Sequence, residues 1–458
     1  MEKKYFARQR PRERGQTIIL VAISLVSLLA MAALAIDIVT LYVARSELQR
    51  ATDAAALAGA KAIADSGLTS LQSADTNYGT AGTLAQTMAD RAINAMIFTS
   101  GVNLVGGQLP VMPGSPTFDL GVTHPGSYQV TVSLTSATLP TFFSKIWSRS
   151  GSIVAATATA EAYNPANLTT PITPIALKSV KPWLVANVDP NKPGTQFINN
   201  TTGVVEQGVT GETLNLTADC QPSGVGCTLL SLTSPPGFGP NNSAGYPQVE
   251  YVPALVNTNP ANVCPTSAAS CSSSCLGASS YELSIECADV NPYTSLSCGN
   301  GSGNATWDNT INPEFGGTAS PSATGADCLI HAPGAGINLE QDTLTNPGWP
   351  SNPMKITGGS CSVASGQVVT TSSSIVTIPI IDTSMTTFPA SGQPLTVVGF
   401  MQAFINQVQD GSTSGTTPGD INVTILNIAG CSSSNNGANP VVGGSGTSPI
   451  PVRLITSP

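Results

Sequence analysis

A chain of 458 residues is long enough for about two or three domains, and only 9% of its residues are charged. Its 44 glycines and 35 prolines favour an extended, loop-rich β protein over a helical enzyme. The net charge of -9 hides an asymmetry, because the first residues are basic while the chain from residue 165 onward carries five basic and sixteen acidic residues. This acidic body has no basic stripe to neutralise phosphates, so we exclude nucleic acid as a partner.

Residues 1–16 form a basic segment in front of an apolar run over residues 17–36. About twenty apolar residues are enough to cross a bilayer core at a rise of 1.5 Å per residue. A cleaved signal peptide is the alternative, but the run is longer than a typical signal-peptide core and no clear cleavage site ends it. We therefore predict a retained, single-pass signal-anchor. Its N-terminus lies in the cytoplasm and the bulk of the chain lies outside, in the periplasm or at the cell surface.

The helical pattern continues beyond Asp37, so residues 17–65 are expected to form one helix, transmembrane first and then amphipathic and extracytoplasmic. Leucines and alanines recur there at alternating spacings of four and three, which places them in one narrow stripe. Small residues in a stripe allow close approach of another helix. Two interpretations stay open: the stripe packs on the chain's own domain, or it packs on other subunits. The predicted helix-packing residues are Leu41, Ala44, Leu48, Ala51, Ala55, Ala58 and Ala62.

Residues 66–164 predict a small α+β module attached to the long helix. Gly67 ends that helix, and a second helix is expected over residues 82–98. Alternating β-branched residues predict strands over residues 128–138 and 152–163, with a short helix after Pro140 between them.

Residues 165–435 predict a β-rich, loop-rich exported domain. Strands are expected over residues 368–381, 394–407 and 421–428, irregular structure over residues 256–330, and a mobile tail over residues 436–458. All ten cysteines lie in this part of the chain, and their irregular spacing favours disulfides in an oxidising compartment over a zinc site. The disulfide candidates are Cys220, Cys227, Cys264, Cys271, Cys275, Cys287, Cys298, Cys328, Cys361 and Cys431.

No residue pattern predicts catalysis, a cofactor or a metal centre. The two histidines, His124 and His331, stand alone near prolines, as solvated residues usually do. Asp382 begins a stretch similar to the metal-binding start of a von Willebrand factor A domain, but too few residues follow for that fold, so we predict a turn. Residues 189–194 look like the start of a calcium loop, but Asn200 stands where a glutamate is required, so this is also predicted to be a turn.

The N-terminal stretch resembles the N-terminal domain of TadE/TadG-like proteins of bacterial Flp (Tad) pilus assembly. The resemblance is specific over about 50 residues and rests on Gly15 before the apolar run, Asp37 at its end, and Asp53 within Asp-Ala-Ala-Ala-Leu-Ala. It implies a pilin-like long helix and an accessory role in assembly. Prepilin processing after Gly15 would place Leu20 at the fifth position, where glutamate is required, so a retained anchor is expected instead.

The sequence thus predicts an α+β fold: a long transmembrane and amphipathic helix, a small pilin-like α+β module, and a β-rich, disulfide-bonded region. The expected function is that of a non-enzymatic, membrane-anchored structural or accessory protein of a Tad (Flp) pilus or related cell-envelope assembly system. Its partners would be the membrane and other pilus assembly or envelope proteins that contact the long helix. The alternative is an anchored, adhesin-like surface binding module, with calcium bound in its acidic loops.

Overall fold

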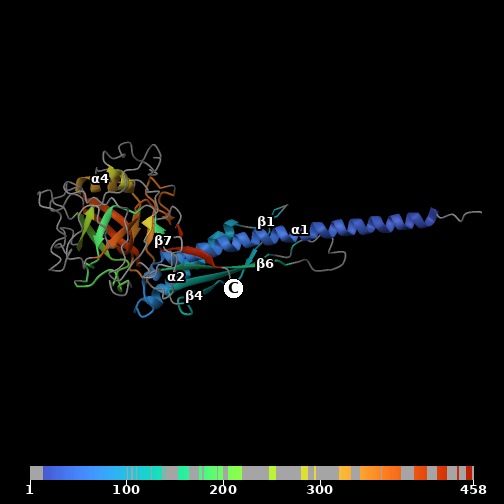
Figure 1. Ribbon diagram of the computed structural model, residues 1–458, viewed down its shortest axis with the longest axis horizontal. Coiled ribbons are helices and arrows are strands. Elements are labelled where there is room, and N and C mark those ends of the chain that lie inside the picture. Colours follow the sequence, from blue (N-terminus) through green and yellow to red (C-terminus); the bar gives the residue numbers. More distant parts are fainter. Residues whose placement is uncertain are drawn as a thin grey trace, which may run out of the picture.

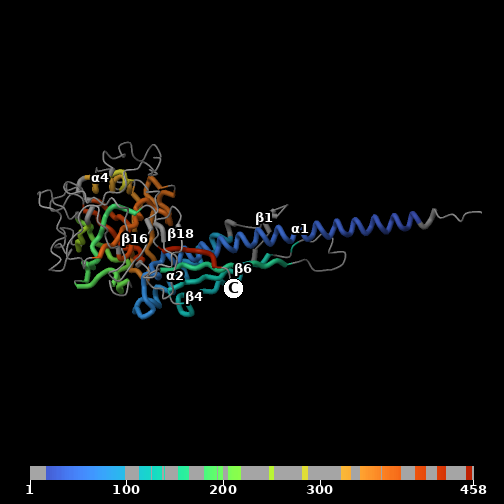
Figure 2. The backbone as a smooth tube through the Cα atoms, in the orientation of Figure 1, coloured from blue at the N-terminus to red at the C-terminus, as the bar shows by residue number. Residues whose placement is uncertain are grey.

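The structure is a computed structural model, shown as a ribbon in Figure 1 and as a backbone tube in Figure 2. It describes residues 14–164 except 101, 105–106, 110, 125, 137–138 and 140–152, and residues 175–199 except 178–179 and 193. It further describes residues 205–218, 247–253, 280–286, 293–294, 319–331, 341–382 except 363, 397–409, 420–430, 441–442 and 450–455. These residues form two modules with separate hydrophobic cores, and a long helix projects from the first (Figure 1).

Helix α1 (Arg14–Asp65) is a single helix of 52 residues and spans about 78 Å. No glycine or proline interrupts residues 17–58, so the backbone hydrogen-bond ladder continues from the apolar run into the alanine-rich half. The helix ends just before Gly67, whose φ of 82° lies in the left-handed region that favours glycine. The 3-10 turn η1 (Leu68–Ser70) and helix α2 (Tyr78–Ser100) follow, and α2 packs against α1.

The first module is completed by a five-stranded sheet under the C-terminal half of α1. Its order is β19-β6-β5-β3, and β4 pairs with another part of β5. The strands are β3 (Val111–Pro113), β4 (Thr117–Leu120), β5 (Ser127–Ser136), β6 (Ala155–Tyr163) and β19 (Val452–Ile455). Alanines line both the helix and β6, including Ala55, Ala60, Ala158 and Ala160, so the helix lies close to the sheet. A short hairpin of β1 (Val102–Leu104) and β2 (Gly107–Leu109) lies against α1 (Figure 1).

The second module is a closed barrel with the strand order β10-β8-β15-β16-β17-β9. The strands are β8 (Trp183–Ala186), β9 (Thr213–Ala218), β10 (Gln248–Pro253), β15 (Ile375–Ile381), β16 (Val397–Gln409) and β17 (Asp420–Gly430). The β9–β10 and β8–β15 pairs are parallel and the other pairs are antiparallel. Helices α3 (Ser280–Glu286) and α4 (Ala319–Ile330) pack on each other and contribute Tyr281, Ile285, Ala326 and Ile330 to the barrel core. Closure leaves these six strands without a free edge.

Two smaller sheets accompany the barrel. One has the order β11-β7-β18, from β7 (Ile175–Leu177), β11 (Tyr293–Thr294) and β18 (Val441–Val442). The other is an antiparallel sheet of β12 (Thr343–Thr345), β13 (Lys355–Thr357) and β14 (Val368–Val369).

The predicted long helix, second helix, module strands and three later strands are confirmed as α1, α2, β5, β6, β15, β16 and β17, with small shifts in their ends. The short helix expected after Pro140 lies outside the described residues. Two expectations were wrong. Part of residues 256–330 is helical, because the apolar side chains of α3 and α4 are buried on the barrel. The segment expected to be a mobile tail contains β19, which is paired in the sheet of the first module.

Candidate functional site

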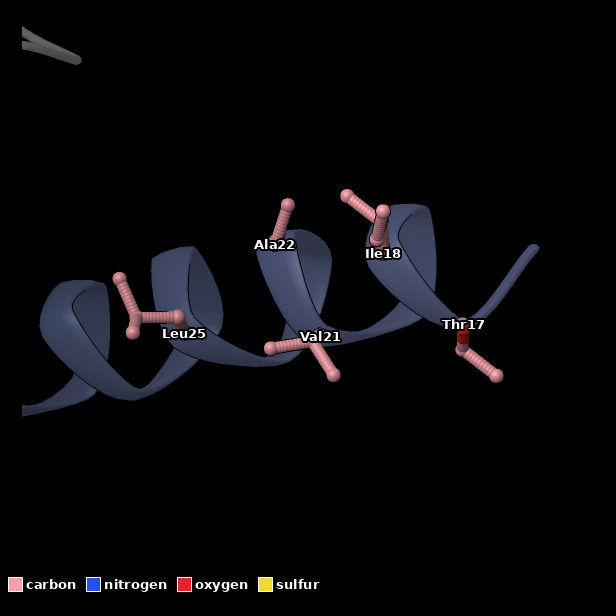
Figure 3. A pocket seen from close by; sticks show the side chains of 5 residues that line it. All are labelled: Thr17, Ile18, Val21, Ala22 and Leu25. Atoms are coloured by element: carbon pink, nitrogen blue, oxygen red, sulfur yellow. The ribbon is translucent and has the colours of Figure 1, made fainter. Parts of the chain in front are cut away.

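The N-terminal half of α1 presents apolar side chains to its surroundings on nearly all sides. Ile18 is 71% exposed, and the large apolar residues that follow are exposed as far as Val43, except for the half-buried Leu41. Figure 3 shows part of α1 near its N-terminal end, where Ile18, Val21 and Leu25 project outward from the ribbon. Among the described helices, α1 is long and apolar enough to cross a membrane.

Three hydroxyl groups in this half of α1 are hydrogen-bonded to backbone carbonyl groups of the same helix. Ser24 donates to the carbonyl oxygen of Val21 at 2.9 Å, Ser27 to that of Ser24 at 2.8 Å, and Thr40 to that of Ile36 at 2.9 Å. Each hydroxyl is therefore satisfied by the helix itself, which lowers the cost of placing it in hydrocarbon.

The exposed apolar stretch is longer than a bilayer core needs. Residues 18–43 rise about 39 Å along the helix, against a hydrocarbon thickness of about 30 Å. The excess corresponds to residues 38–43, which lie after Asp37 and include Val39, 61% exposed, and Tyr42, 75% exposed. We call residues 38–43 the juxtamembrane apolar turn.

The predicted packing stripe lies mainly against the chain's own module. Ala44, Leu48, Ala51 and Ala55 are buried, and Leu41, Ala58 and Ala62 are half-buried. Leu48, Ala51 and Ala55 belong to the same core as the alanines of β6. For the buried residues the structure therefore agrees with packing on the chain's own domain.

The three signature residues have different surroundings. Gly15 lies in the first turn of α1, and Asp37 is only 4% exposed, like Ala33 one turn before it at 5%. The Asp53 carboxylate accepts a 2.7 Å hydrogen bond from Gln49 Nε2, which also donates to the carbonyl oxygen of Thr157 on β6. Asp53 thus helps to hold the polar edge of α1 on the sheet.

The end of α1 is joined to the barrel by buried polar contacts, which we call the junction. Asn427 on β17 donates from Nδ2 to the carbonyl oxygen of Ala64 at 2.6 Å, and its Oδ1 accepts from Ser70 Oγ. Asn164 donates from Nδ2 to the carbonyl oxygens of Thr69 and Ile428, each at 2.9 Å. The bond from Asn427 satisfies a carbonyl group that the end of α1 leaves without a partner within the helix.

An indole and a backbone carbonyl close the junction on its other side. Trp349 donates from Nε1 to the carbonyl oxygen of Ser66 at 2.8 Å. Gly67 has no room for a side chain, because an added Cβ would lie 2.8 Å from Thr210 Cγ2 and 3.1 Å from Trp349 Cζ2. The barrel module therefore contacts the C-terminal end of α1 directly, and no local sequence pattern predicts this contact.

In the loop of residues 189–194, which looks like the start of a calcium loop, a lysine ammonium group lies among the oxygen atoms. Lys192 Nζ lies 2.8 Å from Glu212 Oε1, 3.3 Å from Asp189 Oδ2 and 2.9 Å from the carbonyl oxygen of Gln207. Burial lowers the pKa of Lys192, but its bonds and charge contacts with Glu212 and Asp189 outweigh this effect and raise the pKa above its usual value. An ammonium group thus takes the position among oxygen atoms that a cation would occupy.

Other candidate chemical groups are dispersed. His124 Nδ1 lies 2.8 Å from Asp119 Oδ2 in an exposed turn. Partial burial raises the pKa of Asp119. Hydrogen bonds from His124 and from the backbone of Thr123 and Val122 lower that pKa by more, so the net pKa lies below its usual value. His331 follows α4 with a φ of 59°. Within the described residues, no three His, Cys, Asp or Glu side chains are grouped to hold a metal ion.

Two of the ten cysteines, Cys328 and Cys361, lie in the part of the chain that the structure describes, and neither is a free thiol. The other eight lie outside the described residues, so the five predicted disulfides stay a prediction. Asp382 is buried at the end of β15, and the residues after it in the von Willebrand-like stretch are also outside the described part.

The comparison with known proteins concerns this same helix. No curated protein and no solved structure matches the chain. A family model does match, and it covers the exposed apolar half of α1 together with most of the buried half. Residues 15–62 match the Tad family model, described as putative Flp pilus-assembly TadE/G-like, so the N-terminal region of this chain is similar to that family.

Proposed function

We propose that this chain is a membrane-anchored structural or accessory protein of a Tad (Flp) pilus or a related envelope assembly system. The observation that carries the proposal is the division of α1 into an uncovered apolar half and a half fixed to its own module. The TadE/G-like match spans both halves and supports an association with pilus assembly. The proposed role is structural and not enzymatic.

In this proposal the chain crosses the membrane once, with residues 1–16 in the cytoplasm and both modules outside. The basic residues of the N-terminal segment support this orientation, since such residues stay on the cytoplasmic side. The body would fold in an oxidising compartment, where its cysteines form disulfides. Comparing the mass of the purified chain after alkylation with and without reduction counts those disulfides, and five are expected.

The proposed mechanism is lateral packing of the juxtamembrane apolar turn against helices of partner proteins. The stripe residues Ala44 and Leu48 are not available for this contact, because they are buried in the chain's own core. Val39 and Tyr42 are exposed and lie beyond the length of helix that a bilayer covers. A partner helix would remove these side chains from water.

The anchor is tested by replacing Leu28, which is 67% exposed on α1, with arginine. Arginine at the centre of a membrane helix costs about 2.5–3.5 kcal/mol, so Leu28→Arg should shift the chain from the membrane to the soluble fraction. The matched control is Val122→Arg, because Val122 is 83% exposed in the β4–β5 turn. Equal membrane fractions for the two variants would contradict the anchor. Proteolysis of the body in intact spheroplasts tests the orientation.

The pilus role is tested with Val39→Glu and Tyr42→Glu, with Ser46→Glu as the control on an exposed polar position of α1. The first two variants should remain in the membrane but lose co-purification with pilus components, while the control keeps it. Deletion of the gene should reduce surface pili. Normal pili in the deletion strain would refute the pilus assignment, and calcium-dependent surface binding would then favour the adhesin-like alternative.

A further inference from the structure

The last described strand of the chain belongs to the first module. β19 pairs antiparallel with β6, with Val452 opposite Ala162 and Ile455 opposite Thr159. Ile450, just before the strand, is 2% exposed in the core that α1 shares with the sheet, and Val452 packs against that core. The edge of β6 is therefore covered by residues almost 300 positions later in the chain.

On the other face of the sheet, side chains of β6 favour an arginine in the paired strand. Arg453 Nε lies 2.5 Å from Glu161 Oε1, and its guanidinium carbon lies 5.0 Å from the centre of the Tyr163 ring. The Glu161 side chain is 7% exposed, and its other oxygen accepts a 2.5 Å hydrogen bond from Ser127 Oγ. Without Arg453, a buried carboxylate on β6 loses its cationic partner, which is costly.

The barrel module is consequently an insertion between two parts of the first module. β6 ends at Tyr163, the barrel strands follow, and the chain returns to the same sheet at Ile450. The backbone N–H of Tyr163 donates to the carbonyl oxygen of Pro451 at 3.2 Å, so the two boundaries of the insertion are in contact. An unpaired sheet edge binds an added strand through backbone hydrogen bonds, and side-chain contacts determine which strand sequence binds.

We infer that the edge of β6 is a strand-accepting site for an apolar strand carrying one arginine, and that residues 450–455 of the same chain fill it. The anchor module is incomplete until residues 450–455 have docked, and the same strand binds the vacant edge as a separate peptide. This inference goes beyond the proposed function, because it requires neither a membrane nor a pilus partner.

The test uses the chain in detergent micelles, truncated after residue 449, with truncation after residue 455 as the control. The Tyr163 N–H faces the β19 side, so by the alternation along a strand the N–H groups of Thr159 and Glu161 also face β19. Their amide hydrogen exchange should accelerate at least tenfold in the first truncation and stay unchanged in the control. A labelled peptide of residues 448–458 should bind the first truncation and restore the protection. The peptide with Arg453→Glu should bind at least tenfold more weakly. Unchanged exchange, or equal binding of both peptides, overturns the inference.

A second experiment covers the case in which the truncated chain does not fold. In the full chain, Arg453→Glu places two carboxylates together and should accelerate exchange in β6, while the double variant Glu161→Arg with Arg453→Glu should recover most of the protection. Exchange in β16, which lies in the barrel and not in the sheet that contains β19, serves as the internal reference. If Arg453→Glu leaves exchange in β6 unchanged relative to β16, the inference fails.

Discussion

Asn427 Nδ2 donates a 2.6 Å hydrogen bond to the carbonyl oxygen of Ala64, across a sequence separation of 363 residues. This bond joins the last turn of the long helix to a barrel strand. The same amide accepts a hydrogen bond from Ser70 Oγ, so one barrel side chain contacts both the end of α1 and the 3-10 turn that follows it. The first predictions concern this junction.

Asn427→Ala should lower the free energy of unfolding by about 2–4 kcal/mol, because it leaves a buried helix carbonyl and a buried hydroxyl without their partner. Urea unfolding measures the change. Asn352→Ala is the matched control, since Asn352 is exposed and donates locally to the carbonyl oxygen of Pro347. The control should stay within about 0.5 kcal/mol of the unmodified chain. Similar effects of both substitutions would argue against the junction.

Gly67→Ala should destabilise the chain by about 2–4 kcal/mol, because a left-handed residue gains a Cβ where Thr210 and Trp349 leave no space. Gly366→Ala isolates the backbone contribution, because Gly366 has a φ of 74° but no atom within 4 Å of the added Cβ. Thermal unfolding should show a loss of only about 1–2 kcal/mol for that control. The difference between the two variants measures the steric contact at the junction.

Alkaline pH should weaken the fold. Burial raises the pKa values of Tyr78, Tyr128, Tyr163 and Tyr251 above their usual value. The folded state therefore holds these protons longer than the unfolded state. Their stabilising contribution is complete below about pH 10 and is lost as the pH rises above it, by at most about 1.4 kcal/mol per pH unit for each tyrosine.

Urea unfolding between pH 8 and pH 11 checks this expectation. Tyr251→Phe should reduce the slope of stability against pH, because it removes a buried phenol whose pKa is raised. A stability that does not change over this pH range would mean that the tyrosines are accessible to water in the folded chain.

Lys192→Met should destabilise the barrel module by about 1–2 kcal/mol, because it leaves the carboxylates of Asp189 and Glu212 close together. The value is small for a pair with a buried partner, since the Lys192 side chain is 41% exposed and water screens its charge. The double variant Lys192→Met with Glu212→Gln should regain part of the loss in urea unfolding. No recovery would indicate that packing of the lysine stem, and not charge, stabilises this loop.

Much of the first module was predictable because its signals are local. The apolar run, the absence of glycine between Gly15 and Gly59 and the alternating residues of β5 and β6 each depend on neighbours within a few positions. The barrel was not predictable as a barrel, although β15, β16 and β17 were expected as strands. Closure requires parallel pairing of β8 with β15 and of β9 with β10, and no short-range pattern specifies these partners.

The same distinction applies to the candidate site. The spacing of Leu48, Ala51 and Ala55 predicted a packing stripe, but it did not tell whether the chain's own sheet or another subunit covers it. The structure places these residues in the chain's own core and leaves Val39 and Tyr42 exposed beyond the length of helix that a bilayer covers. The segment expected to be a mobile tail was misjudged for a related reason, since its strand is ordered by contacts with Glu161 and Tyr163 far away in the sequence.

The sequence by itself determined the long helix, its apolar half and the TadE/G-like signature, because helix formation and membrane affinity are summed over neighbouring residues. Only the tertiary structure decided where that helix becomes buried, which residues contact its C-terminal end and which strand pairs with the edge of β6. Those decisions depend on contacts such as Asn427 with Ala64 and Arg453 with Glu161, between residues that are hundreds of positions apart.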